Sequence, residues 1–314
     1  MISEETQAIQ ALKEVAMEGI KEQRRARRWG IFFKLFFIAY LLLVLFALFD
    51  NTGKESKLAT ADKITAVVDI NGVIMDGAEA SAELVVPSLK EAFENAKTKA
   101  VMIRLNSPGG SPVQAGIIND EIRRLKAEHK DIPVYAVVSD LCASGGYYIA
   151  VAADKIYADK ASIVGSIGVR MDNFGLVGLM EKLGVQRRLY TAGANKGMLD
   201  PFLPEKPEQV EHVQKMLDIT HQQFINVVKQ GRGNRLKETP DMFSGLFWTG
   251  EEAVKLGLID GLANDNYVAR ELIQAEDMVN FTSKKDFLRS LSEKVETSIH
   301  SFLATEDSPR TLLR

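Results

Sequence analysis

Hydrophobic positions divide the chain into one long apolar run and a longer part in which strand-like and helix-like patterns alternate. From Trp29 to Phe49 almost every residue is apolar, about the roughly 20 residues that are needed to cross a hydrocarbon core. A buried core helix and a cleaved signal sequence are the alternatives, but Leu41–Phe46 is strongly lipid-like and no small-residue cleavage site follows it. The pattern predicts a transmembrane helix at residues 29–49, in contact with membrane lipid.

Charge on either side of this run predicts its orientation. Five basic residues crowd just before it and Asp50 follows it; the basic residues are Lys21, Arg24, Arg25, Arg27 and Arg28. The positive-inside rule then puts the N-terminus in the cytoplasm and the remainder outside. The predicted organisation is a cytoplasmic leader (1–28), the transmembrane helix (29–49), a polar stalk (50–62), a folded domain (63–280), and an amphipathic helix with a mobile tail (281–314).

Within the folded domain, period-two and helical patterns alternate, which is typical of an α/β fold with a mostly parallel sheet. The expected strands are 64–74, 100–105, 134–138, 155–158, 163–169 and 186–190. The expected helices are 82–96, 112–126, a small-residue helix after Ser144, 174–183 and 207–229. Thr249 and Glu252 form the sequence signature of a capping box at the start of another short helix.

Composition narrows the classes of function. The chain has 314 residues, 46% hydrophobic and 26% charged, with a formal net charge of −3. Outside the basic cluster the chain is slightly acidic, so nucleic-acid binding is not favoured. Cys142 is the single cysteine, which excludes an intramolecular disulfide. No internal repeat is apparent.

Ser144 is the first candidate for chemistry. It lies in Ala143-Ser144-Gly145-Gly146, between a predicted strand and a predicted helix. Free N–H groups and the dipole at a helix N-terminus favour developing negative charge there. The same position is also the usual one for a serine that only caps its helix, and the motif alone leaves both interpretations open.

A glycine turn upstream favours the nucleophile. Asn106-Ser107-Pro108-Gly109-Gly110 follows a predicted strand and precedes the helix that starts at Pro112. Glycines there can direct a backbone N–H toward a ligand oxygen, and with the N–H of Gly145 this gives the two donors of an oxyanion hole. An ordinary glycine turn between strand and helix is the alternative.

A serine that attacks an amide needs a base. The histidines are His129, His212, His221 and His300, and their positions are typical of surface or packing residues. A lysine can replace histidine, since burial of an amine favours its neutral form. Lys196 is the best candidate, because the small, weakly charged segment around it could bury the amine; Lys155 and Lys160 have charged neighbours that indicate solvated strand ends.

The chain resembles the signal peptide peptidase A family, membrane-anchored serine proteases with a Ser-Lys dyad and a fold like that of Clp protease and crotonase, built from repeated ββα units. The likeness covers about residues 64–263 and rests on several ordered motifs: Asn106–Gly110, Ala143–Tyr148, Ser162–Val169, the Lys196 segment, Trp248–Gly250 and Gly257–Asp260. It implies that Ser144 is the nucleophile, Lys196 the general base, Gly110 and Gly145 the oxyanion donors, and Ser166 the residue that orients the lysine amine. No metal or cofactor is implied.

The resemblance also carries expectations about assembly and substrates. With one copy of the domain, the chain is similar to the short form of the family, whose protomers form a ring or dome on a bacterial inner membrane. Serine and lysine then meet within one chain or across a subunit boundary. Remnant signal peptides and other unfolded or hydrophobic peptides are the expected substrates, bound in apolar pockets for small or aliphatic side chains. The alternatives are a catalytically silent peptide-binding or membrane scaffold and a crotonase-like acyl transfer enzyme.

Overall fold

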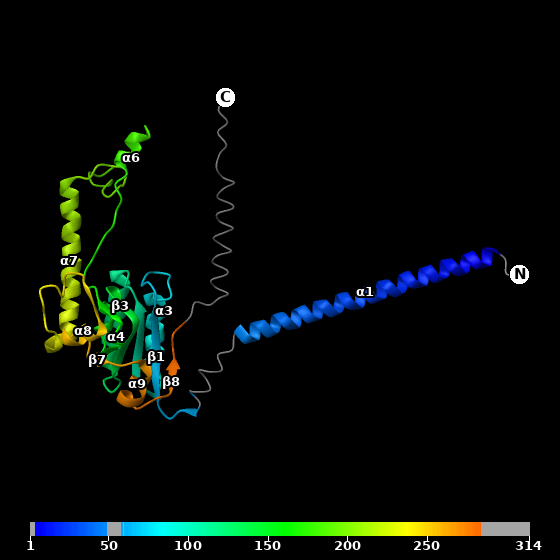
Figure 1. The fold of residues 1–314 in the computed structure, drawn as a ribbon, viewed down its shortest axis with the longest axis horizontal. Helices are drawn as coiled ribbons and strands as arrows, with labels where there is room; N and C mark the ends of the chain where they lie inside the picture. The colour runs from blue at the N-terminus through cyan, green and yellow to red at the C-terminus, as the bar shows by residue number, and fades with distance from the viewer. Residues whose placement is uncertain (1–3, 49–57, 59, 284–314) are drawn as a thin grey trace. The chain divides into compact units, whose positions relative to one another are not determined.

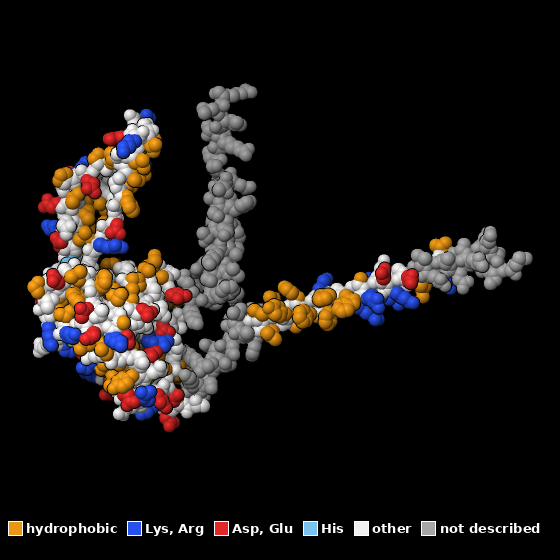
Figure 2. Space-filling view, in the orientation of Figure 1, with side chains coloured by type: hydrophobic (Ala, Val, Ile, Leu, Met, Phe, Trp, Pro, Cys, Tyr) orange, Lys and Arg blue, Asp and Glu red, His pale blue; other side chains and the backbone are white. Residues whose placement is uncertain are grey.

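The computed structural model describes residues 4–48, 58 and 60–283. The chain divides into two units, Met1–Ala59 and Thr60–Arg314, and each is described by itself. In the first unit one helix, α1 (Glu4–Leu48), contains the described part of the leader and continues into the apolar run. Large apolar side chains are exposed along it (Figure 2); they include Trp29, Ile31, Phe32, Phe33, Leu35, Phe36, Phe37, Ile38, Tyr40, Leu41, Leu42 and Leu43.

Among the residues that the structure describes, no helix combines the length and apolarity that crossing a membrane requires. The predicted span at 29–49 ends outside the described residues, and it stays a prediction.

The second unit is built on one sheet, to which eight strands contribute in the described part of the chain (Figure 1). The strands are β1 (Ile64–Asn71), β2 (Thr98–Ser107), β3 (Val134–Ala143), β4 (Lys155–Ala158), β5 (Ile163–Gly165), β6 (Phe247–Thr249), β7 (Gly261–Leu262) and β8 (Met278–Asn280). Their order is β6-β5-β3-β2-β1-β8, with β4 between β3 and β7. Every pair is parallel except β5–β6, which confirms the predicted mostly parallel sheet.

Helices cover the sheet because its strands are apolar on both faces. The crossover helices α3 (Ala82–Glu94), α4 (Pro112–Glu128) and α5 (Gly145–Ala150) pack together beside β1, β2 and β3. A second core cluster, which includes Val67 and Met102 of the sheet, packs against the turn η2 (Val268–Ile273) that follows α9 (Asp265–Tyr267). The remaining helical elements are α6 (Val177–Lys182), α7 (Pro207–Arg232), η1 (Gly233–Arg235) and α8 (Gly250–Lys255).

Most predicted elements are confirmed, including the capping box of α8, in which Thr249 and Glu252 bond reciprocally. The predicted strand at 186–190 is wrong, because this segment is irregular and exposes Tyr190 at 90%. Two predicted strands are shorter than expected: β1 ends at Asn71, and β5 at Gly165. The amphipathic helix and tail predicted for residues 281–314 lie, beyond residue 283, outside the described residues.

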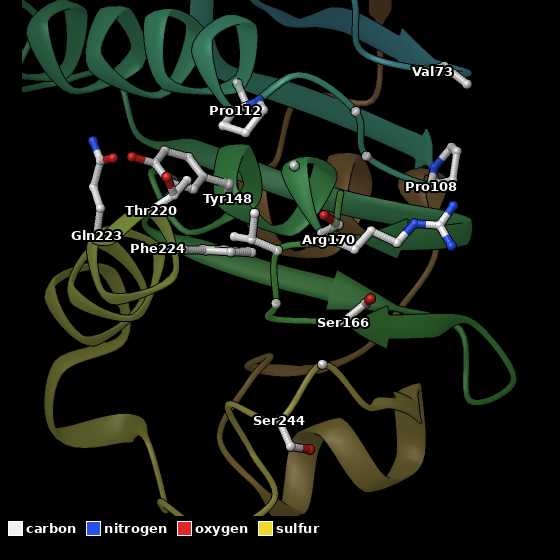
Figure 3. Close-up of a pocket in the computed structure, with 18 residues that line it drawn as sticks. Val73, Pro108, Pro112, Tyr148, Ser166, Arg170, Thr220, Gln223, Phe224 and Ser244 are labelled. Atoms are coloured by element: carbon white, nitrogen blue, oxygen red, sulfur yellow. The ribbon is translucent and has the colours of Figure 1, made fainter. Parts of the chain in front are cut away.

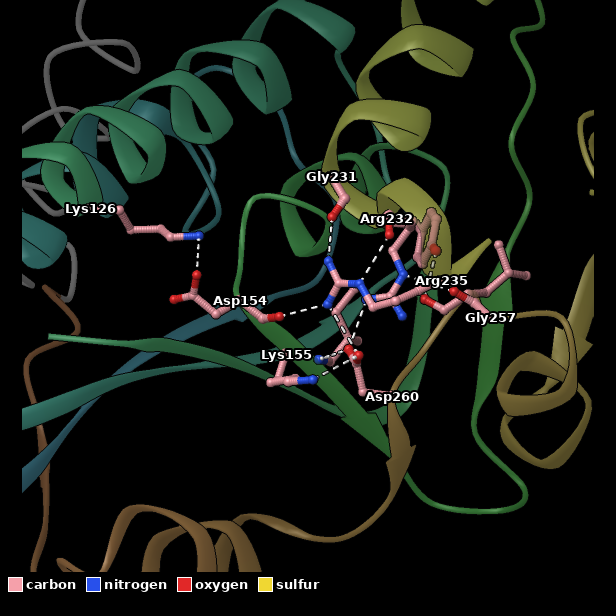
Figure 4. A network of polar contacts seen from close by, with 11 residues as sticks. Lys126, Asp154, Lys155, Gly231, Arg232, Arg235, Gly257 and Asp260 are labelled. Carbon is pink, nitrogen blue, oxygen red and sulfur yellow. Dashed lines mark hydrogen bonds and ion pairs between the residues drawn. The ribbon is translucent and has the colours of Figure 1, made fainter. Parts of the chain in front are cut away.

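A buried ion pair fixes the C-terminal end of α7 (Figure 4). Arg232 is 2% exposed; its Nη1 donates to Oδ2 of Asp260 at 2.8 Å, and its Nε donates to the carbonyl of Gly257 at 2.8 Å. Next to it, a Cβ added to Gly231 would lie 2.1 Å from the carbonyl oxygen of Val151, which directly follows α5. From this fixed base α7 extends away from the sheet, with α6 near its opposite end (Figure 1).

Candidate active site

Ser144 lies at the sharp turn from β3 into α5. Its backbone has φ 52° and ψ −121°, a region that a residue with a Cβ rarely adopts. The main chain is held on both sides, since its N–H donates to the carbonyl of Gly165 at 2.8 Å and its carbonyl accepts from Tyr148 at 2.9 Å. The hydroxyl makes no capping hydrogen bond to α5. Ser144 therefore does not use its side chain as a helix cap, and it is one of the residues that line a cleft.

The glycine turn packs directly against this serine. Gly109 has φ 96°, and a Cβ there would lie 2.7 Å from the Cβ of Ser144, so only glycine permits this approach. A Cβ added to Gly145 would lie 3.2 Å from the backbone nitrogen of Gly110, so the N–H groups of Gly110 and Gly145 are near neighbours. In the described part of the chain, neither N–H donates a hydrogen bond to a backbone carbonyl outside the helix itself. The two donors predicted for the oxyanion hole are thus brought together beside Ser144.

Buried Ser107, which the sequence analysis did not single out, holds the glycine turn in shape. Its hydroxyl donates to the carbonyl of Gly72 at 2.6 Å and accepts from the N–H of Gly109 at 3.1 Å. The sequence signal for this role was a serine two residues before a glycine, because a serine hydroxyl at that place can accept a hydrogen bond from a backbone N–H of the turn.

Ser166 reaches the same cleft because β5 pairs with β3, with Gly165 opposite Ala143. It also has a positive φ, 53°, and its N–H donates to the carbonyl of Leu246 at 2.7 Å. The structure therefore brings together Ser144, Ser166 and both glycines.

Lys196 lies elsewhere. It is exposed, and the carboxamide of its neighbour Asn195 accepts from Gln209, in the first turn of α7, at 3.1 Å. The cleft is instead lined by residues in the second half of α7, such as Gln223. Fourteen residues separate 209 from 223, so at 1.5 Å per residue the two places are about 20 Å apart along the helix. One chain does not bring Lys196 to Ser144.

None of the histidines within the described residues lines the cleft. His221 comes nearest in the fold, but its Nε2 lies 3.1 Å from the carbonyl oxygen of Ile167 and so satisfies the backbone beside Ser166. His129 ends α4 and packs on Phe93, with ring centroids 5.5 Å apart. His300 lies outside the described residues.

The cleft has a volume of about 700 Å³ and is open to solvent (Figure 3). Besides the predicted site residues it is lined by Val73, Pro108, Gly109, Pro112, Ala115, Tyr148, Gly168, Val169, Arg170, Thr220, Gln223, Phe224, Ser244 and Gly245. Pro108, Gly109, Pro112, Tyr148, Gly168 and Val169 stand in segments that the sequence motifs mark, but no role in a cleft was predicted for them. The remaining positions were missed. In the described part of the chain, no cluster of three or more His, Cys, Asp or Glu residues has the arrangement of a metal site.

Two buried groups close to Ser144 in the sequence are held in their neutral forms. Burial raises the pKa of the Cys142 thiol far above its ordinary value, so this cysteine is not a competing nucleophile. Burial, together with the charge of Asp120, also raises the pKa of Tyr148. Its phenol stays protonated and can donate a hydrogen bond.

Comparison with known proteins identifies the family. A sequence profile for peptidase family S49 matches residues 126–279. A putative protease from Methanocaldococcus jannaschii is 32% identical over 251 residues, which cover 77% of this chain and 78% of that protein. The chain belongs to peptidase family S49.

Other relatives match a smaller share of this S49 chain and of their own length. A putative signal peptide peptidase from Enterococcus faecium is 33% identical over 219 residues, 67% of this chain and 63% of that protein. A Brucella melitensis protein named as a Na⁺/H⁺ antiporter is 49% identical over 203 residues, 63% of this chain, but the chain spans only 27% of that protein's length. The predicted resemblance to the signal peptide peptidase A family is confirmed. The matched segment of the S49 chain includes Ser144, Ser166 and Lys196 and begins after Gly110.

Proposed function

We propose that this chain is a serine endopeptidase in which Ser144 is the nucleophile. One observation carries the proposal: Ser144 does not use its hydroxyl as a helix cap, and it lines a cleft together with Gly110 and Gly145, whose N–H groups are near neighbours. In the reaction the Ser144 oxygen attacks a peptide carbonyl carbon, and the two N–H groups stabilise the negative charge that develops on the carbonyl oxygen. Release of the amine leaves an acyl-enzyme, which water hydrolyses.

Lys196 is the proposed base, supplied by a neighbouring copy of the chain. Because about 20 Å separates the Lys196 segment from the cleft within one chain, a second protomer has to bring the amine to Ser144. Burial in that interface favours the neutral amine, which accepts the proton of Ser144 and later gives it to the leaving amine. Ser166, next to Ser144, is the proposed partner that orients the amine. Such an arrangement requires a homo-oligomer, and a ring or dome is the form that family resemblance implies.

Unfolded or hydrophobic peptides, including remnant signal peptides, are the proposed substrates. The cleft is open to solvent and can admit an extended chain, but a volume of about 700 Å³ leaves no room for a folded one. The name of the Enterococcus relative, a putative signal peptide peptidase, supports the same substrate class.

The proposed site of action is the extracytoplasmic surface of a bacterial inner membrane, with residues 29–49 as the anchor. Exposed apolar side chains on the described part of α1 support this, because a helix that is apolar over its surface requires an apolar environment. Alkylation of single cysteines introduced at residues 13 and 60, in intact and in lysed cells, tests it. Labelling of residue 13 but not of residue 60 from the outside contradicts the orientation.

The decisive experiment combines labelling and complementation. A fluorophosphonate probe should label Ser144, as read by mass spectrometry, and Ser144→Ala should lower kcat for an unfolded peptide by at least about 1,000-fold. Lys196→Ala should do the same, while the exposed control Lys182→Ala should retain activity. Mixed oligomers of the Ser144→Ala and Lys196→Ala chains should regain activity if the base comes from a neighbour. Full activity of Ser144→Ala refutes the proposal, and no recovery on mixing refutes the shared site.

A peptide-binding scaffold is the second candidate, and the separation of Lys196 from Ser144 within one chain favours it. A scaffold binds unfolded peptide without turnover and leaves the probe unreacted. Turnover that depends on both residues excludes it.

A further inference from the structure

Polar side chains from α5 and α7 gather at one side of the cleft. In Figure 3, Thr220, Gln223 and the Tyr148 hydroxyl lie together, and Ser166 and Arg170 lie at the opposite side. This is unexpected for a site that binds small aliphatic side chains, since such a pocket needs no hydrogen-bonding groups.

The walls that lead to these polar groups are apolar. Pro112 and Ala115 of α4 line the cleft, and so does the ring of Phe224, whose centroid is 5.1 Å from that of Tyr148. A side chain that enters here therefore runs along hydrocarbon surface before its end meets the polar groups.

These three polar groups can form further hydrogen bonds. Thr220 donates its hydroxyl hydrogen to the carbonyl of Met216 at 2.9 Å, so it can only accept from a ligand. For the Tyr148 hydroxyl and the Gln223 carboxamide, no hydrogen bond is found to any residue that the structure describes. Together they offer donors and acceptors that an apolar ligand tip leaves unpaired.

A carboxylate and a guanidinium of α4 both act on the Tyr148 hydroxyl. Burial is the largest cause of its raised pKa; beyond that, Asp120 raises the pKa and Arg123 lowers it. Arg123 donates to buried Asn119, and its Nη2 is buried with no partner in the described part of the chain. Because charges of both signs act on this hydroxyl, neither a negative nor a positive ligand tip meets a site of purely opposite charge. The environment suits a neutral polar tip.

We propose that the cleft selects a substrate residue with an apolar stem and a neutral, amide-like tip, glutamine above all, and that Gln223 and Tyr148 bind this tip. The proposal rests on the proposed peptidase function and specifies its substrate class. It departs from the small or aliphatic side chains implied by the family resemblance. The carboxamide of glutamine donates to and accepts from Gln223 while its oxygen accepts from the Tyr148 hydroxyl, a set that methionine of similar length does not provide.

The test uses the full chain in detergent micelles and two sets of otherwise identical unfolded peptides, with glutamine or methionine at each position in turn. At one position near the scissile bond, kcat/KM should be about tenfold higher for glutamine, the value of one well-made hydrogen bond. Gln223→Leu should bring that ratio near one or invert it, and Tyr148→Phe should reduce it. Gln222→Leu is the matched control: Gln222 bonds Asn226 at 3.0 Å and does not line the cleft, so the ratio should stay unchanged.

The ratio is insensitive to the fraction of folded enzyme, because both peptides meet the same sample. Equal cleavage of the two peptides at every position, an unchanged ratio in Gln223→Leu, or an equal loss in Gln222→Leu overturns the proposal. Binding of the two peptides to Ser144→Ala, measured by fluorescence anisotropy, separates it from the proposed function. A glutamine preference in binding without any cleavage by the wild type supports the cleft assignment and refutes the peptidase, whereas cleavage without preference does the reverse.

Discussion

Asp260 is the negative charge at the base of α7, and its removal without a change of shape gives a sharp test of how this helix is fixed. The side chains of Arg232 and Asp260 are 1% and 7% exposed, so Asp260→Asn leaves a guanidinium buried without its counter-ion. Loss of one partner of a buried pair costs about 3–5 kcal/mol. We expect about 3 kcal/mol, because the carboxamide oxygen still accepts from the N–H of Ile156, which now lies 2.8 Å from the carboxylate.

The pH dependence of this loss follows from the pKa of Asp260. Burial would raise that pKa, but the hydrogen bond and charge of Arg232 outweigh burial, and the pKa lies below its ordinary value of 3.8. A carboxyl group whose folded-state pKa is lowered contributes its full stability above the unfolded value and loses it as the pH falls through the folded value. The difference between wild type and Asp260→Asn should therefore be constant from about pH 5 to 8 and should shrink below about pH 4.

Urea unfolding of the full chain in detergent, followed by circular dichroism, measures the free energy. Asp172→Asn is the control, because Asp172 is 65% exposed and pairs loosely with Arg170 at 3.7 Å; such a surface pair contributes at most about 1 kcal/mol. The double variant Arg232→Met/Asp260→Asn removes both charges, keeps an acceptor for the N–H of Ile156 and should recover most of the loss. An Asp260→Asn loss no larger than that of the control refutes the reasoning, as does a double variant as unstable as the single one.

Two further substitutions test the surroundings of Ser144. Gly110→Ala adds a Cβ at φ 150°, 2.0 Å from the carbonyl oxygen of Ile74, so it should displace one oxyanion donor and lower kcat at least about 100-fold. Circular dichroism is the folding control. An unchanged kcat in the folded variant argues against that donor. Tyr147→Phe removes a buried hydrogen bond of 2.7 Å to the carbonyl of Leu258. The free energy of unfolding, measured with urea, should fall by about 1–3 kcal/mol. A fall of less than about 0.5 kcal/mol contradicts the role of this hydrogen bond in anchoring α5.

The sequence predicts those elements that bury a face of their own. The strands at 64–71 and 100–105 and the helix at 112–126 carry continuous or periodic apolar residues, and the structure buries them. The segment 186–190 has a similar local pattern but pairs with no strand among the residues that the structure describes, and alternation alone does not supply one. Local pattern thus fails where a long-range partner decides the outcome.

The residues of the site also fall into two groups, those placed by local motifs and those placed by long-range contacts. Ser144, Gly110 and Gly145 stand in short motifs whose turns are locally encoded, and the structure brings them together. Gln223 lies about 80 residues further along the chain, on a helix whose docking depends on the pair Arg232–Asp260 at its far end. No short motif could predict that Gln223 faces the cleft.

The conformation of Ser144 depends on the whole domain and not on its own motif. A positive φ at a residue with a Cβ costs about 1–3 kcal/mol and persists only where the surroundings fix it. Here β5 accepts its N–H, the glycine turn packs on its Cβ, and α5 is held at its other end by Tyr147 and by the close approach of Gly231 to Val151. A serine that only caps a helix has extended backbone angles and needs none of these contacts. The strain at Ser144, together with the contacts that maintain it, is therefore the physical reason to assign this serine a chemical role and not a capping one.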